Sequence, residues 1–381
     1  MAVPMLDLER QYAPIRDEIL AALAEVVDKR SFILGQPVAG FEQAAAQSLG
    51  VAEAIGCASG TDALWLALAA AEIGPGSAVV TTPFSFFASI SSILRAGSTT
   101  LLSDIDPITF NLDPSGVEKL LQTQKGSSIK ALLPVHLYGQ CVNWGEFARL
   151  GKEYSLTLVE DAAQAWGASW NGVSAGSLGD IAAFSFYPTK NLSAAGDAGL
   201  VTTNRPELAE RARMLRQHGM RERYHHDEVG WNARMDGFQG AVLSVNLRYI
   251  PERNLLRREA ALRYTQLFAA TGLAENGVYP EHGVVLPREI ADGTHCWHQY
   301  VIRSAQRDGL REYLTSQQIG SEIYYPVPLH RQKALEFLGY PEGSFPEAER
   351  AAREVLALPI FPEIRPEEQK RVVEAIAEFL S

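Results

Sequence analysis

Short apolar segments alternate with helical segments through the first half of this 381-residue chain. Strands are predicted at residues 52–57, 78–83, 100–105, 131–136, 155–160 and 181–186. Helices are predicted between most of them, at residues 61–72, 89–95, 114–122 and 144–154. This alternation predicts an α/β fold with a mainly parallel sheet covered on both faces. Ligands of such sheets bind beyond the carboxyl ends of the strands.

The second half of the chain has a different pattern. Helices are predicted at 206–216 and 230–249, with a polar loop at 221–227 between them. Pro251 marks a plausible domain boundary, and an amphipathic helix is predicted at 252–270. Shorter elements follow: strands at 298–303 and 321–325, and helices at 310–317, 346–356 and 366–380. We therefore predict a large domain, residues 1–250, which includes an N-terminal helix at 7–29, and a smaller C-terminal α+β domain, residues 251–381.

Composition excludes several classes of protein. A net charge of −11 argues against an extended nucleic-acid surface. The longest apolar windows, such as 63–71, are too short to span a bilayer, and the N-terminus lacks the features of a secretory signal. Cys57, Cys141 and Cys296 are widely spaced and predict reduced thiols and no metal site. We expect a cytoplasmic protein that binds neither nucleic acid nor membrane.

Lys190 lies in the segment Phe184-Ser185-Phe186-Tyr187-Pro188-Thr189-Lys190-Asn191-Leu192, directly after a predicted strand. Aromatic residues and a proline surround it, where a solvated face would carry other charges. A partly dry site lowers the pKa of a lysine amine and suits it to form a Schiff base. The alternative is a loop lysine that contacts only solvent.

Gly60 and Thr61 begin a predicted helix after the small residues Ala58 and Ser59. The first turn of a helix offers free backbone N–H groups and a positive dipole end, which together bind phosphate. The pattern is neither a dinucleotide-binding nor a nucleoside-triphosphate loop. Alternatively, Asp62 only caps this helix.

Phe86, His136, Asp161 and Lys190 all follow predicted strands, so a single site can collect them. An imine-forming lysine, a carboxylate after a strand, an aromatic residue and an anion site at a helix start together match the needs of pyridoxal 5′-phosphate. Lys190 would hold the cofactor and move the proton, Asp161 would pair with the pyridine nitrogen, and Phe86 would stack on the ring. Asp161 could instead cap a following helix.

The phosphate of that cofactor would bind at Gly60 and Thr61. The hydroxyl of Ser185 would assist.

Several short motifs, in a shared order and spacing, resemble the DegT/DnrJ/EryC1/StrS family of pyridoxal-phosphate-dependent nucleotide-sugar aminotransferases over nearly the whole chain. They are Leu8-Glu9-Arg10-Gln11-Tyr12, Ser59-Gly60-Thr61-Asp62-Ala63-Leu64, Pro134-Val135-His136-Leu137-Tyr138-Gly139, Val159-Glu160-Asp161-Ala162-Ala163-Gln164, the Lys190 segment, Asn232-Ala233-Arg234-Met235-Asp236, Tyr325-Pro326-Val327-Pro328-Leu329-His330 and Leu356-Ala357-Leu358-Pro359-Ile360-Phe361.

The resemblance implies an aspartate-aminotransferase-type fold and a homodimer with active sites at the subunit interface. It implies that Asn232 reaches the cofactor phosphate of the partner subunit and that Gln164 bonds the ring hydroxyl. The positions that would face the sugar nucleotide are Tyr187, Tyr224, Tyr325 and His330. Candidates for binding its diphosphate are Arg223, Tyr325 and His330.

The expected reaction transfers an amino group from L-glutamate to a nucleotide-linked 3-keto-6-deoxyhexose, through a Schiff base on Lys190. The string Phe-Tyr-Pro-x-Lys-Asn-Leu resembles enzymes that act at C3, whereas C4 enzymes more often carry histidine at the position of Tyr187. Three alternatives stay open: a C4-specific aminotransferase, a dehydratase like the family members that replace the lysine by histidine, and a non-catalytic regulator that keeps the fold. The chain departs from the usual family pattern at Trp166, Thr189, Ser193 and Ala198, which bears on the substrate more than on the cofactor.

Overall fold

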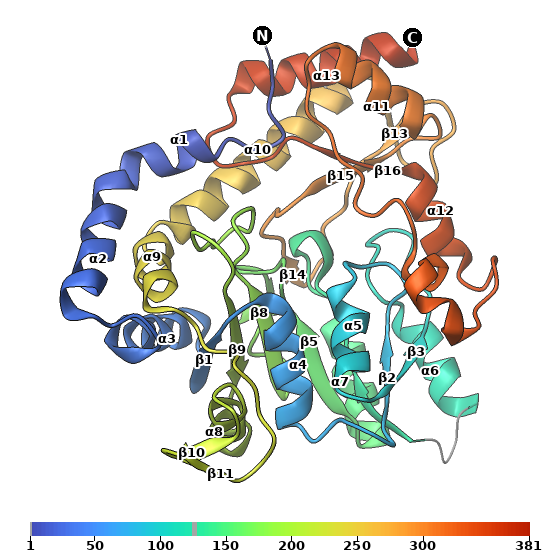
Figure 1. The fold of residues 1–381 in the computed structure, drawn as a ribbon. Coiled ribbons are helices and arrows are strands. Elements are labelled where there is room, and N and C mark those ends of the chain that lie inside the picture. Colours follow the sequence, from blue (N-terminus) through green and yellow to red (C-terminus); the bar gives the residue numbers. More distant parts are fainter. Residues whose placement is uncertain (1, 124–127) are drawn as a thin grey trace.

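The computed structural model describes residues 2–123 and 128–381, and its central element is a seven-stranded sheet (Figure 1). The strand order is β1-β9-β8-β5-β4-β2-β3. In chain order the strands are β1 (Glu53–Cys57), β2 (Ala78–Thr81), β3 (Thr99–Leu102), β4 (Ile129–Leu132), β5 (Thr157–Asp161), β8 (Ile181–Ser185) and β9 (Gly199–Thr203). Only β9 runs antiparallel to its neighbours in this sheet. The predicted α/β fold is therefore confirmed, while β9 was not predicted.

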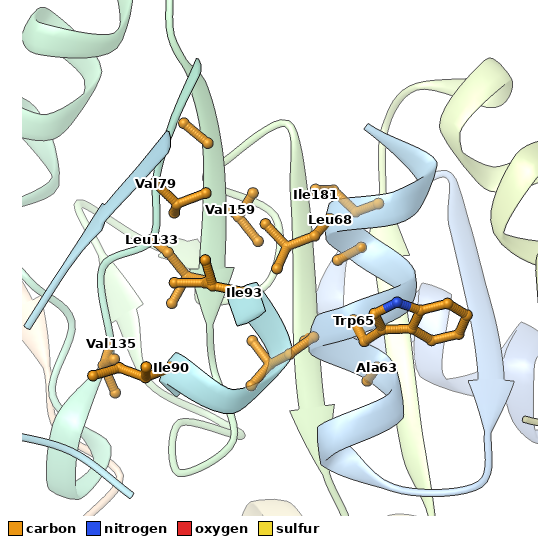
Figure 2. Packing of buried hydrophobic residues seen from close by; sticks show 14 of the residues in the cluster. Ala63, Trp65, Leu68, Val79, Ile90, Ile93, Leu133, Val135, Val159 and Ile181 are labelled. Carbon is orange, nitrogen blue, oxygen red and sulfur yellow. The ribbon is translucent and has the colours of Figure 1, made fainter. Parts of the chain in front are cut away.

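Helices cover both faces of this sheet, as the continuously apolar strands require. On one face, residues of α4 (Gly60–Ala70) and α5 (Ala88–Arg95) pack on the strands (Figure 2). On the other face lie α6 (Pro114–Thr123) and α7 (Trp144–Tyr154). Successive residues divide between the two cores: Val79 joins the first and Val80 the second. This alternation follows the two-residue period of a strand.

Further helices flank the sheet near β1: α2 (Arg16–Lys29), α3 (Gly35–Leu49), α8 (Pro206–Leu215) and α9 (Gly237–Leu247). The predicted helix at 230–249 is thus shorter. Residues before Gly237 are extended instead, because Asn232 and Arg234 make bridge pairs with Gln217 and Cys57. The predicted loop at 221–227 contains a short hairpin of β10 (Met220–Glu222) and β11 (His225–His226).

The long helix α10 (Ile250–Thr271) leads into the C-terminal part of the chain, with Pro251 in its first turn. Proline is tolerated there because the first-turn N–H has no partner within the helix. A four-stranded sheet follows, in the order β12-β13-β15-β16. Its strands are β12 (Ala274–Glu275), β13 (Val284–Val285), β15 (Tyr300–Arg303) and β16 (Val355–Leu358). The helices of this part are α11 (Arg307–Ser316), α12 (Pro346–Glu354) and α13 (Pro366–Leu380).

Two predictions in this part of the chain are wrong. The predicted strand at 321–325 makes only one bridge, between Glu322 and Ala357. The predicted helix at 346–356 ends at Glu354, and the chain continues as the buried strand β16. A short apolar run suits a buried helix end and a buried strand equally well, so periodicity alone does not separate them.

The N-terminus packs on the C-terminal part of the chain. Val3 exchanges backbone hydrogen bonds with Gln318 and Gly320 on either side of Ile319. A short helix, α1 (Leu8–Tyr12), follows, and Arg10 within it forms an ion pair with Glu368 of α13 at 2.7 Å. The remaining short strands, β6 (Ser169–Trp170), β7 (Val173–Ser174) and β14 (Gly293–Thr294), form a small sheet.

The three cysteines are free and buried, as predicted. Within residues 2–123 and 128–381, no helix combines the length and the apolar character needed to cross a membrane. The same residues contain no cluster of three or more potential metal ligands.

Candidate active site

Lys190 lies on a tight turn that follows β8. Its backbone N–H donates to the carbonyl of Tyr187 at 2.8 Å, which closes the turn. The side chain is half-buried. Burial lowers the pKa of Lys190 to about 8, although the nearby Asp161 carboxylate acts in the opposite direction. A lysine with this lowered pKa is neutral in a larger fraction of molecules than an ordinary lysine, so it can act as a nucleophile and a base.

Asp161 ends β5 and is 4% exposed. The Ser89 hydroxyl donates to one carboxylate oxygen at 2.7 Å, and the Ala163 N–H donates to the other at 3.2 Å. Burial raises the pKa of Asp161, while these two hydrogen bonds and Lys190 lower it. No helix begins after Asp161, so the alternative role as a helix cap is wrong. This carboxylate is instead oriented in a dry site that also holds a lysine.

The start of α4 lies directly against Ser185. A Cβ atom at Gly60 would approach the Ser185 Cβ to 2.5 Å, so only glycine fits this position. Ser59 caps the helix by accepting from the Asp62 N–H at 3.0 Å. The alternative in which Asp62 caps the helix is wrong: Asp62 supports Ser59 instead, because it accepts from the Ser59 hydroxyl at 3.0 Å.

This arrangement can bind a phosphate. The N–H groups of Gly60 and Thr61, in the first turn, have no partner within the helix. The Ser185 oxygen accepts from the Tyr187 N–H at 3.4 Å, which leaves its own hydrogen free to be donated. The start of α4, beside Ser185, therefore combines backbone N–H donors, a hydroxyl and the positive end of an eleven-residue helix.

Aromatic and amide side chains border the site. Phe86 is 59% exposed, so one face of its ring is open for stacking. The Tyr325 ring lies 6.3 Å from it. Gln164 donates to the Tyr325 hydroxyl at 3.1 Å and accepts from the Tyr138 N–H at 2.6 Å. Asp161 also interacts electrostatically with Tyr325. The chain therefore brings together Phe86, Gln164, Tyr325 and Asp161, as expected.

Other predicted site residues lie apart from this group in the single chain. Arg223 and Tyr224 occupy the β10–β11 hairpin, which projects beyond α8 at the lower edge of Figure 1. Their side chains stack on each other at 5.0 Å, and Tyr224 is 76% exposed. Asn232 is exposed and adjoins Trp231, which packs edge-on against Trp65 of α4.

Tyr187 and His330 differ in exposure. Tyr187 is 53% exposed next to the Lys190 turn. His330 is 2% exposed, and its Nε2 is 3.0 Å from a carboxylate oxygen of Glu349. Burial lowers the pKa of His330, and Glu349 opposes this effect. The Nδ1 of His330 has no hydrogen-bond partner in the described part of the chain.

His136 does not join the site, contrary to expectation. Its Nδ1 accepts from the Val142 N–H at 3.2 Å, so its Nε2 carries the hydrogen and donates to Glu160 at 3.0 Å. The ring is completely buried in this arrangement. Sequence reasoning placed the residue at the correct strand end but could not decide which way its side chain points.

Sequence reasoning also missed Ser89. Its hydroxyl donates to Asp161, so it accepts from the Ser85 hydroxyl at 2.8 Å. Serine is common at the start of a helix. Nothing in the local pattern indicates that this serine donates a hydrogen bond to a residue 72 positions away.

Comparison with known proteins places this site in context. The model of the DegT/DnrJ/EryC1/StrS aminotransferase family matches residues 14–377. A "pleiotropic regulatory protein" of Geobacillus stearothermophilus is 46% identical, with 100% of this chain and 99% of the relative covered. A UDP-N-acetyl-3-dehydro-alpha-D-glucosamine 3-aminotransferase of Acidithiobacillus ferrooxidans is 40% identical, with 98% and 97% covered. A dTDP-3-amino-3,4,6-trideoxy-alpha-D-glucose transaminase of Streptomyces venezuelae is also 40% identical, with 99% and 96% covered.

Solved structures agree with this assignment. DesV of S. venezuelae, determined in complex with a ketimine intermediate, superposes with a TM-score of 0.94 at 39% identity, covering 100% of this chain and 99% of that one. NtdA of Bacillus subtilis, determined with bound cofactor PMP, gives a TM-score of 0.90 at 29% identity, covering 100% and 85%.

The residues of this chain fit the same cofactor. The Gly60–Thr61 turn and Ser185 suit its phosphate, the open face of Phe86 suits its ring, and Asp161 and Lys190 suit its nitrogen and its aldehyde. The chain belongs to the DegT/DnrJ/EryC1/StrS aminotransferase family and is a transaminase that uses pyridoxal phosphate.

Proposed function

We propose that this enzyme transfers the amino group of L-glutamate to C3 of a nucleotide-linked 3-keto-6-deoxyhexose. The observation that carries the proposal is the half-buried Lys190 amine, whose pKa is about 8, beside the buried Asp161 carboxylate and the phosphate-binding turn of α4. Two relatives whose names specify a 3-amino sugar or a 3-dehydro sugar, each 40% identical over nearly the whole chain, support the substrate class and the position.

The residues of this chain then have distinct roles. The cofactor supplies an electron sink for the carbanion that forms when a C–H bond next to nitrogen breaks. Lys190 would hold the cofactor aldehyde and, when its amine is free, its Nζ would accept the proton from one carbon and return it to another. The Asp161 carboxylate would accept a hydrogen bond from the protonated pyridine nitrogen and so favour its positive charge. Ser89 keeps the Asp161 carboxylate in the required orientation.

Substrate binding would use both sides of the site. Tyr187 and Tyr325 are the aromatic residues beside the Lys190 turn and Gln164, where the sugar would lie. In this proposal Gln164 also reaches the ring hydroxyl of the cofactor. His330 would contribute its unpartnered Nδ1.

A second copy of the chain would complete the site. Arg223 and Tyr224 are exposed on a projecting hairpin, and Asn232 is exposed nearby in the sequence. We propose that the enzyme is a homodimer in which this hairpin binds the diphosphate of the nucleotide in the partner's site and Asn232 contacts the partner's cofactor phosphate. An exposed, stacked arginine and tyrosine suit this role, because a guanidinium binds phosphate oxygens in a bidentate manner.

The reaction can be tested directly. The purified enzyme should absorb visible light, lose that absorbance with L-glutamate and release 2-oxoglutarate. Lys190→Ala should do neither. Incubation with glutamate and a panel of nucleotide keto sugars, followed by NMR of the product, identifies the substrate. A 4-amino product would assign the enzyme to the C4-specific group, and the absence of any amino sugar would refute the substrate class.

A further inference from the structure

His298 lies in the segment that enters β15, which is far from the Lys190 turn in the sequence but adjoins it in the structure. The Cys296 N–H donates to the carbonyl of Gly139 at 2.9 Å, and the Gln299 N–H donates to that of Tyr138 at 3.2 Å. The same Tyr138 donates its N–H to Gln164. His298 is therefore held against the wall of the cofactor site.

The hydrogen bonds of Asn191, the residue after Lys190, determine which ring nitrogen of His298 carries the hydrogen. The Nδ2 of Asn191 donates to the carbonyl of Cys296 at 2.9 Å and to the Oδ1 of Asn254 at 3.0 Å. Since Nδ2 faces two acceptors, the remaining atom Oδ1 must accept. The Nδ1 of His298 lies 3.2 Å from that Oδ1. His298 thus carries its hydrogen on Nδ1 and donates it to Asn191.

The charge of the ring agrees with this assignment. His298 is 6% exposed. Burial lowers the pKa of His298 well below its ordinary value, and the positive charges of Lys190 and Arg257 and the nearby His295 lower it further. The imidazole is therefore neutral at physiological pH, with one donor committed to Asn191.

We propose that His298 is a positioning residue that holds Lys190 in place through the Nδ1–H···Oδ1 bond to Asn191. The Lys190 side chain must alternate between holding the cofactor and moving a proton, so its backbone needs to stay fixed. Misplacing a reacting group by about 1 Å can slow a reaction about 100-fold. Within the turn, the Lys190 N–H donates to the Tyr187 carbonyl and the Tyr187 N–H donates to the Ser185 hydroxyl. His298, Cys296 and Asn254 supply the external anchor to the next residue. This inference rests on the role proposed for Lys190.

The test compares His298→Asn with His298→Gln in the full-length enzyme. An Asn amide places an N–H donor near the position of Nδ1, whereas a Gln amide places its polar atoms near Nε2. Two rates are measured: capture of pyridoxal phosphate by cofactor-free protein, followed by absorbance, and a single turnover of the loaded enzyme with L-glutamate. We expect His298→Gln to slow both by about 10- to 100-fold and His298→Asn to stay within about threefold of the wild type.

His295→Ala is the matched control. His295 belongs to the same segment, is 5% exposed and stacks on Trp297 at 4.0 Å, but it accepts from the Trp297 N–H and makes no bond to Asn191. It should lower the melting temperature without slowing cofactor capture. The inference is overturned if His298→Asn and His298→Gln behave alike, or if His295→Ala slows capture as much as His298→Gln. If the wild type captures the cofactor normally but does not react with L-glutamate, the proposed amino donor is wrong. The role of His298 is then still tested by the rate of cofactor capture.

Discussion

Glu160 and Asp161 are neighbours at the end of β5, both acidic and both almost fully buried, yet their surroundings differ completely. Glu160 accepts four hydrogen bonds, from the N–H groups of Gly176, Leu178 and Gly179 and from the His136 ring. Asp161 accepts two and lies near the Lys190 amine. A carboxylate that accepts a hydrogen bond at each of its acceptor positions, such as Glu160, stabilises the fold. A buried carboxylate with acceptor positions unused, such as Asp161, can bind a ligand or take part in catalysis.

We expect the largest effect from a substitution that removes the charge of the Asp161 carboxylate. Asp161→Asn keeps the shape but cannot hold a positive charge on the cofactor nitrogen. We expect kcat to fall about 1000-fold, as for the loss of a central electrostatic contact. The melting temperature should change little or rise, because burying the ionised group is unfavourable. A variant that retains more than about a tenth of the wild-type kcat would show that Asp161 does not support the cofactor.

Glu160→Gln tests the other member of the pair. One Glu160 oxygen accepts from the Gly176 N–H and the His136 ring, and the other accepts from the N–H groups of Leu178 and Gly179. The amide nitrogen of Gln would replace one of these oxygens and would face two donors. Opposed donors in a buried site should destabilise the fold by about 2–4 kcal/mol, measured by urea unfolding. The kcat per folded molecule should stay near the wild-type value. A large loss of kcat with normal stability would contradict the division of roles.

Ser89→Ala should have a smaller effect on the catalytic carboxylate. Removing the hydroxyl leaves Asp161 with one donor and raises its pKa, since the Ser89 hydrogen bond lowers it. Because the ionised form is required, activity should decline at a higher pH than in the wild type as the solution is acidified. We expect kcat at neutral pH to fall about tenfold. The pH–rate profile checks this, and Ser92→Ala is a control, because that hydroxyl donates to the Ser89 carbonyl and, among the described residues, makes no bond to Asp161.

The smallest effect concerns the pH at which Lys190 becomes reactive. The neutral amine is the nucleophile, so capture of pyridoxal phosphate by cofactor-free protein should rise with pH, with a midpoint at about 8. Asp161 raises the pKa of Lys190. Asp161→Asn should therefore move the midpoint to lower pH, and Glu160→Gln should leave it in place. Equal midpoints in all three proteins would show that Asp161 does not act on the lysine amine.

Much of the central sheet could be predicted from the sequence. The parallel strands are short apolar runs separated by helices, and their order in the chain already placed Lys190, Asp161 and Phe86 at strand ends. The antiparallel strand β9 was not predicted, although three of its five residues, Val201, Thr202 and Thr203, are β-branched and favour a strand. The first two residues of β16, Val355 and Leu356, were included in the predicted helix at 346–356 because they continue the apolar pattern of the helix before them.

The candidate site was predicted where the evidence was local. A lysine between aromatic residues, a glycine at a helix start and an acid after a strand each have a nearby signal. Ser89, Asn191 and His298 have none, because each acts on a residue that folding brings to it. For the same reason His136 was expected at the site and lies instead against Glu160.

The sequence by itself determined the alternation of strands and helices, the residue types at the strand ends and the membership of a family, because these depend on local composition and on motif order. The tertiary structure alone decided that Glu160 stabilises the fold and that Asp161 lies in the candidate active site. Strand geometry sends successive side chains to opposite faces, but the sequence does not say which face meets four donors and which meets a lysine. That depends on Gly176, Leu178 and Gly179 on one side and on Ser89 and Lys190 on the other, all of them distant in the chain.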